Sequence, residues 1–168
     1  MAYGVVRTDN MFGTDVRAGL VSIKYMGANG TTPTAIQNGN VLKVGALMNG
    51  EREIFVGAAP AANDDLKDIV LVATPEVMYD ERKRNLDEFI NEAGRACRGY
   101  RLHKGDIFSV TKDALDGVAA PAVGNVVELK AGTKLNVAAS ATSGSTQVGK
   151  IIAVDVVGRY TYYVILVG

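Results

Sequence analysis

The stretch that decides the predicted fold is residues 74–94, TPEVMYDERKRNLDEFINEAG. Its apolar side chains recur at spacings of three and four, the period of one face of an α-helix. These side chains are Leu86, Phe89, Ile90, Ala93 and then Ala96 or Cys97. Two start signals compete, at Thr74 and at Asp80, and Gly94 can end a helix because glycine adopts the left-handed conformation without strain. We favour the later start and expect one amphipathic α-helix over about 81–94.

The remainder of the chain has the pattern of short strands separated by turns. Apolar and polar residues alternate in 20–25, as in a half-buried strand, and Asn49-Gly50 between two apolar runs is a strong hairpin signal. The apolar run at 69–72 indicates a strand covered on both faces. The expected strands, of which the fifth and sixth should pair, are 20–25, 41–47, 51–56, 68–73, 98–102, 106–111, 126–130, 134–138, 151–157 and 160–167. The prediction is a mainly β fold, a compact β-barrel or β-sandwich of about ten short strands with one amphipathic α-helix.

The amino-terminal segment combines chain breakers with apolar side chains that need a covering surface. The apolar residues are Val5, Val6, Met11 and Phe12. We interpret 1–19 as an extended arm that binds a partner, and the alternative is a frayed terminus. Residues 20–168 are expected to form a single β-rich domain with the helical segment inserted at 75–97.

Composition limits the classes of function. The chain has 168 residues, enough to bury a core without disulfides or metals, and its 18 basic residues equal its 18 acidic residues. A neutral chain has no net field to attract a polyanion, so general nucleic-acid binding is disfavoured. No apolar run is long enough to span a membrane, and the first residues are not those of a secretion signal. We expect synthesis in a cytoplasm and no membrane contact.

Residues for catalysis or metal binding are scarce. His103 is the only histidine and Cys97 the only cysteine, and neither has an evident orienting group. The spacing of these residues and of the acidic pairs fits neither a zinc site nor a calcium loop. Phosphate-binding glycine loops are missing from the sequence. We therefore expect a protein that is not an enzyme and has no cofactor, metal site or catalytic residue.

Three consecutive basic residues lie near the start of the expected helix. They are Arg82, Lys83 and Arg84. Positive charge at a helix amino end opposes the macrodipole, although pairs such as Lys83 with Asp87 offset part of the cost. These residues form either a solvated face or a surface that meets acidic groups on a partner.

The last expected strand, 160–167, has large side chains on both faces. Alternation along a strand places Tyr163 and Ile165 together on one face, with tyrosine, valine and leucine on the other. Two apolar faces require a second layer of structure. We expect Tyr163 and Ile165 to be covered within one subunit or by a neighbouring copy in a closed oligomer.

Several segments resemble small proteins of tailed bacteriophages that infect Gram-positive bacteria. These segments are 1–8, 75–94, 105–110, 148–154 and 158–164, so the likeness spans nearly the full length. The resemblance implies a virion structural protein, and the family that it fits best is the capsid decoration proteins, also termed cement or head-stabilising proteins. It implies binding to the major capsid protein on the capsid exterior, as a small homo-oligomer, a trimer or dimer, without direct nucleic-acid contact.

Two other classes of function stay open. A self-assembling shell or tail-tube subunit would polymerise without a partner. A virion-displayed module that binds a carbohydrate or a receptor would expose aromatic side chains on loops, and Tyr3 and Tyr79 are the tyrosines outside the strand patterns.

Overall fold

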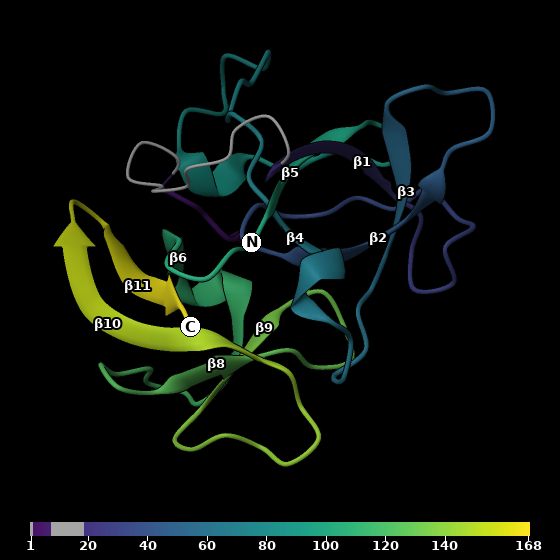
Figure 1. Ribbon diagram of the computed structural model, residues 1–168. Helices are drawn as coiled ribbons and strands as arrows, with labels where there is room; N and C mark the ends of the chain where they lie inside the picture. The colour runs from purple at the N-terminus through teal and green to yellow at the C-terminus, as the bar shows by residue number, and fades with distance from the viewer. Residues whose placement is uncertain (1, 8–18) are drawn as a thin grey trace.

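Figure 1 shows the computed structural model, which describes residues 2–7 and 19–168. Within these residues the chain forms eleven strands in two sheets, a closed five-stranded barrel and a six-stranded sheet. The barrel strands are β1 (Leu20–Tyr25), β2 (Val41–Leu47), β3 (Ile54–Ala58), β4 (Ile69–Val72) and β5 (Cys97–Arg101). The strands of the second sheet are β6 (Ile107–Thr111), β7 (Leu115–Gly117), β8 (Val126–Glu128), β9 (Leu135–Ala138), β10 (Gln147–Val157) and β11 (Tyr160–Val167). Short 3₁₀ turns are η2 (Leu66–Asp68), η3 (Leu86–Glu88) and η4 (Lys112–Ala114).

The barrel closes because β5 pairs antiparallel with both β1 and β4. Around it the strand order is β1-β3-β2-β4-β5, with β1 and β3 parallel. Its interior holds Ile23, Leu42 and Val70, all fully buried. Gly57 and Gly99 leave space for these side chains, since a Cβ at either position would lie within 3.0 Å of one of them. Glycine at these two places lets a narrow barrel contain large aliphatic residues.

The second sheet is built around the hairpin of β10 and β11, which Figure 1 shows as the long curved pair of strands at the lower left. The sheet order is β6-β11-β10-β8-β9-β7. A two-residue turn at Gly158 and Arg159 joins the hairpin, and Gly158 has the positive φ that such turns require. A register shift between Ile151 and Ala153 marks a β-bulge, which bends the strand.

The main core lies between the barrel and the second sheet. Strand β4 belongs to both layers: Ile69 and Leu71 face the main core, while Val70 and Val72 face the barrel interior. All four are fully buried. The prediction that this strand is covered on both faces is confirmed, and it explains why the sequence here lacks polar alternation.

The first described residues belong to the fold, which corrects the docking-arm prediction for Val5 and Val6. Val6 pairs with Val110 of β6 in an antiparallel bridge, and the N–H of Thr111 donates to the carbonyl of Val5 at 3.0 Å. Val5 is 1% exposed and Val6 is 2% exposed, so a partner has no access to either side chain. Their apolar character serves the chain's own core. Met11 and Phe12 lie outside the described residues.

The prediction of an α-helix over 81–94 is wrong. This segment is an irregular loop in which only η3 (Leu86–Glu88) is helical, as a single 3₁₀ turn, and Leu86 is exposed. Long-range backbone bonds take the place of a helix: Asn91 and Ile36 form an antiparallel bridge, with N–H to carbonyl distances of 3.0 and 2.9 Å. A helix of this length is marginal in water without a packed face. The tertiary bonds therefore determine the conformation.

Two strand predictions also need correction. The described residues form eleven strands rather than about ten, because β7 (Leu115–Gly117) lies in a segment expected to be loop. Strands β5 and β6 do not pair across Lys104 and Gly105: β5 completes the barrel, while β6 pairs with β11 in the other sheet. The turn after β5 is the crossing from one sheet to the other.

Candidate functional site

The candidate site is the long connection from β4 to β5, called here the 74–96 loop. It carries the three basic residues singled out in the sequence and two of the most exposed apolar side chains of the described chain, Tyr79 at 89% and Val77 at 61%. The loop leaves the barrel at the buried end of β4 and returns at Cys97. Its two ends and one internal turn are held by the rest of the chain.

Asn38 fixes the start of the loop. Its Nδ2 donates to the carbonyl of Thr74 at 2.7 Å and to Oε1 of Glu76 at 3.1 Å. Its Oδ1 accepts from the N–H of Thr74 at 3.1 Å. Asn38 is 1% exposed while Thr74 and Glu76 are half-buried, so these bonds are part-buried and their loss leaves the amide of Asn38 without partners inside the protein. The backbone at Thr74 is thereby held in one position.

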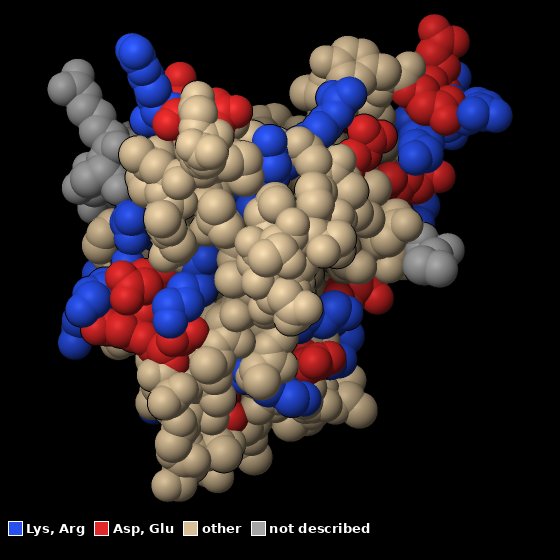
Figure 2. Space-filling view, turned by 90° about the vertical axis from the view of Figure 1, so that its right-hand side faces the viewer, with Lys and Arg blue, Asp and Glu red and all other residues tan. Residues whose placement is uncertain are grey.

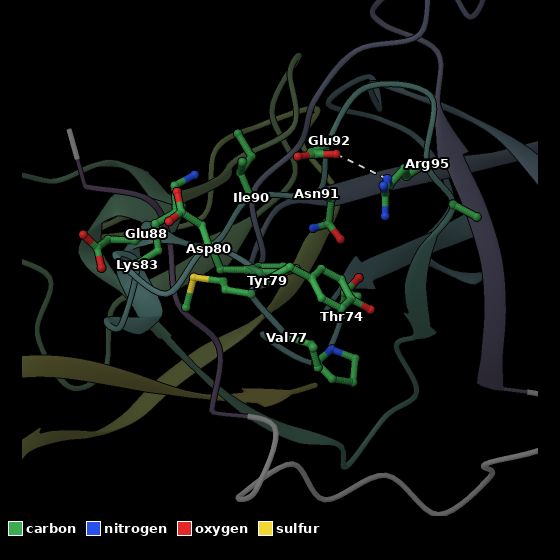
Figure 3. A pocket seen from close by; sticks show the side chains of 14 residues that line it. Thr74, Val77, Tyr79, Asp80, Lys83, Glu88, Ile90, Asn91, Glu92 and Arg95 are labelled. Atoms are coloured by element: carbon green, nitrogen blue, oxygen red, sulfur yellow. Dashed lines mark ion pairs between the residues drawn. The ribbon is translucent and has the colours of Figure 1, made fainter.

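The same side chain also holds the end of the loop. The Nδ2 of Asn91, which is buried, donates to Oδ1 of Asn38 at 3.0 Å and to the carbonyl of Ile36 at 3.1 Å. Asn38 and Asn91 therefore form a clamp, which we call the asparagine clamp, that brings the two ends of the 74–96 loop together. Figure 3 shows Asn91 among the residues that line the resulting hollow, between Ile90 and Arg95.

Asp87 fastens the middle of the loop to the tip of the β10–β11 hairpin. Its carboxylate accepts from Nη2 of Arg159 at 2.7 Å and from the hydroxyl of Tyr160 at 2.9 Å, and its carbonyl accepts from the N–H of Tyr3 at 3.0 Å. Burial and the hydrogen bond to Asp87 raise the pKa of Tyr160. The residues between the clamp and Asp87 make mainly local bonds and project from this frame.

The 74–96 loop lines a cavity of about 690 Å³ that is open to solvent. In Figure 3, Thr74, Val77 and Tyr79 lie on one side of it and the Glu92–Arg95 ion pair on the other. The lining is Thr74, Pro75, Val77, Met78, Tyr79, Asp80, Lys83, Glu88, Phe89, Ile90, Asn91, Glu92, Arg95 and Ala96. Apolar and polar groups contribute equally to this lining, a mixture that protein-binding surfaces share.

The charges around the hollow are largely balanced by neighbours. Nε of Arg82 donates to Asp80 at 3.0 Å, and this hydrogen bond lowers the pKa of Asp80 below its ordinary value. The backbone N–H groups of Asn85 and Arg84 donate to Glu88, and they lower its pKa likewise. Both carboxylates are therefore ionised at neutral pH, and they balance part of the positive charge of Arg82, Lys83 and Arg84.

The structure separates the residues that the sequence suggested for partner binding. Arg82, Lys83 and Arg84 are exposed on the 74–96 loop, and only Lys83 lines the hollow. Ile165 is fully buried in the main core, and Tyr163 packs partly buried against it. That face of β11 is therefore covered within the chain, one of the two alternatives expected.

The opposite face of β11 is covered in part, because Tyr162 is buried while its neighbours on that face are half-buried. Tyr162 is buried, and the guanidinium of Arg7 lies over its ring at 5.5 Å from the centroid. The amino-terminal residues thus contribute to the second layer that two apolar faces require.

The described residues offer little for catalysis. Cys97 is buried in the barrel, burial raises its pKa to about 12, and its thiol donates to the carbonyl of Ile23 at 3.1 Å. His103 is exposed, with Nδ1 3.7 Å from a carboxylate oxygen of Asp106. Among residues 2–7 and 19–168 no group of three or more His, Cys, Asp or Glu side chains could hold a metal ion. No helix of the described chain is long and apolar enough to cross a membrane.

Reasoning from sequence missed the residues that shape the site. Asn38 does not enter the predictions from sequence, and Asn91 and Asp87 fall within the segment predicted to be a helix. The available signal was the apolar cluster Val77, Met78 and Tyr79 beside strongly polar residues, in a segment with a proline and no strand pattern.

Comparison with known proteins identifies no relative. No protein-family model, no curated protein and no solved structure matches this chain. Its function is therefore argued from the residues and their arrangement.

Proposed function

We propose that this chain is a virion structural protein that binds the outer surface of a phage capsid and stabilises or decorates it. The observation that carries the proposal is the 74–96 loop. It exposes Val77 and Tyr79 to solvent, while the asparagine clamp and Asp87 fix its backbone to the rest of the chain. Exposed apolar side chains on a fixed frame suit docking, because little conformational entropy is lost on binding. The partner would be the major capsid protein, in keeping with the resemblance to decoration proteins.

Charge supports an outer rather than an inner position on a shell. The chain has no net charge, and Figure 2 shows acidic and basic residues interspersed among large uncharged areas on the face it presents. A protein on the inner face would meet packaged DNA, which attracts basic surfaces. Many weakly bound copies suffice on a lattice when a closed oligomer engages several sites together.

A second candidate is a module that binds a carbohydrate or a receptor on the host surface. Tyr79 favours it, since an aromatic ring 89% exposed beside hydrogen-bonding groups is a suitable platform for a small ligand. Lattice docking fits the loop better, because Val77 is exposed as well and both Asp80 and Glu92 are already paired within the chain.

The test is sedimentation of the purified chain with empty capsids of the phage that encodes it. Wild-type chain should pellet with capsids up to a saturating number of copies. The double variant Val77→Ser with Tyr79→Ser should bind at least about tenfold more weakly, because it removes the exposed apolar contacts. Val123→Ser is the matched control, since Val123 is also exposed but lies on another loop. Binding unchanged in the double variant would exclude this loop, and no binding by wild type would refute the proposal.

A further inference from the structure

Within residues 2–7 and 19–168, the far half of β10 has a strand edge to which no other strand is paired. β8 pairs with β10 only from Gln147 to Lys150, and the loop residues Gly124 and Asn125 bond to Ile151. From 152 to 157 the only neighbour of β10 among the described strands is β11. Figure 1 shows β10 sweeping beyond β8 along the periphery, with β11 on its inner side.

Apart from the β-bulge between Ile151 and Ala153 at its start, this edge lacks most of the features that normally protect a strand from pairing. Its sequence, Ile-Ala-Val-Asp-Val-Val, has no lysine, proline or glycine, and Asp155 is its only charge. Val154 is 39% exposed and Val156 is 75% exposed. A long, β-branched edge without such residues is a template for another strand. Its length of about 20 Å, at roughly 3.3 Å per residue, is that of an ordinary strand.

The hairpin tip is fixed, and the backbone groups of the β10 edge point outward. Arg159 and Tyr160 at the hairpin tip are bonded to Asp87, so the tip is fixed to the body of the molecule. Val157 pairs with Tyr160 directly across the two-residue turn. Residues next to such a turn bond to each other, and pairing alternates along the strand. Val156 and Val154 therefore direct their N–H and carbonyl groups away from β11.

We propose that this edge binds the same edge of a second copy of the chain, as an antiparallel β10–β10′ pair about a two-fold axis centred on Val154. A two-fold axis normal to the sheet keeps the faces of both copies aligned, so residues on the same face lie opposite each other. In this register Ile152 meets Val156 of the second copy and Ala153 meets Asp155. The two copies of Val154 lie opposite each other and exchange backbone hydrogen bonds.

Charge selects this register over its neighbour. A pair centred on Asp155 is equally long, but it places two carboxylates directly opposite each other, which destabilises a strand pair. A pair centred on Ala153 would extend over Ile151, whose backbone is already bonded to Gly124 and Asn125. The two-fold pairing is closed, because the described part of each copy offers one such edge, and it yields a dimer rather than a fibre.

The proposal concerns contact between copies and does not depend on capsid binding, so it is tested without capsids. Sedimentation equilibrium should show a reversible dimer. Val154→Lys places two lysines opposite each other, and Val156→Lys places a lysine against Ile152; each should raise the dissociation constant at least about tenfold. Leu47→Lys is the control, because Leu47 is also aliphatic and exposed but lies on β2, outside this edge, and the variant should leave dimerisation unchanged. Circular dichroism confirms that each variant is folded, and the high exposure of Val156 keeps that variant available if Val154→Lys unfolds.

Cysteine crosslinking tests the register. The natural Cys97 is buried, so a cysteine introduced at the surface is the reactive thiol. Val154→Cys should form disulfide-linked dimers under mild oxidation, since residues opposite each other in adjacent strands lie within disulfide reach. Val156→Cys should link far more slowly, because its copies are separated by about four residues, roughly 13 Å. A monomeric wild type, a dimer insensitive to both lysine variants, or crosslinking of Val154→Cys no faster than Val156→Cys would each overturn the proposal.

Discussion

Replacing Asn38 by alanine should destabilise the chain more than replacing Asn91, although both belong to the asparagine clamp. Asn38 makes four hydrogen bonds, and Thr74 depends on it for both its N–H and its carbonyl. Asn38→Ala therefore loses four bonds and also leaves the part-buried N–H and carbonyl of Thr74 without a protein partner, for a cost of about 2–4 kcal/mol. Asn91→Ala loses two side-chain bonds, but Ile36 still accepts from the Asn91 N–H and Asn38 still accepts from Thr74. Its cost should be about 1–2 kcal/mol.

Urea denaturation of the variants measures these differences in the free energy of unfolding. Asn125→Ala is the control, because Asn125 accepts one exposed local bond from the N–H of Ala122, and its loss should cost below about 1 kcal/mol. Hydrogen exchange at the Thr74 amide should speed up in Asn38→Ala. An Asn38→Ala cost equal to or below that of Asn91→Ala would refute the reasoning that Asn38 holds the loop.

Three further predictions follow from buried groups. Burial disfavours the ionised form of Glu128, but hydrogen bonds from Thr142 and Asn136 outweigh it and hold the pKa of Glu128 below its ordinary value of 4.5. The ionised carboxylate of Glu128 therefore stabilises the fold fully above pH 4.5, and this stabilisation is lost as the pH falls through the lower pKa of the folded state. In Glu128→Gln the free energy of unfolding should fall less steeply between neutral and acidic pH. An unchanged slope of unfolding free energy against pH would contradict this. Cys97, with its pKa raised to about 12, should resist iodoacetamide in the native chain and react in urea, and rapid native labelling would contradict its burial. Tyr163→Asp should lower the melting temperature markedly, because Tyr163 packs on the chain's own core; a stable variant that only loses oligomers would place its cover between subunits.

The strands could be predicted from sequence where a local pattern decides the conformation. The alternation in β1, the apolar run of β4 and the last strand β11 lie where predicted. Gly50 and Gly158 have the positive φ that their turns require. Each of these signals depends on neighbouring residues alone, and each was sufficient.

The 74–96 loop could not be predicted because its conformation depends on distant residues. Leu86, Phe89 and Ile90 have helical spacing, but Asn91 pairs with Ile36 and Asp87 bonds to the hairpin tip. Asparagine and aspartate are weak helix formers, so a few long-range bonds outweigh the local preference. The basic residues at the expected helix start already opposed the dipole, and this conflict was a signal against a helix.

Of the candidate site, the sequence predicted only that its basic residues are exposed. Arg82, Lys83 and Arg84 are on the surface as expected, whereas Val5 and Val6 are in the core. Apolar residues near a chain end fit a docking arm and an added edge strand equally well, and only the position of β6 distinguishes the two.

The most direct measurement of the central claim is a cryo-electron microscopy reconstruction of the phage virions to which the proposed function assigns this chain. The proposed function predicts density for the chain on the outer capsid surface, in repeated lattice positions, with the 74–96 loop against the major capsid protein. Absence of the chain from the virion, or its location inside the shell or in the tail tube, would contradict the proposal.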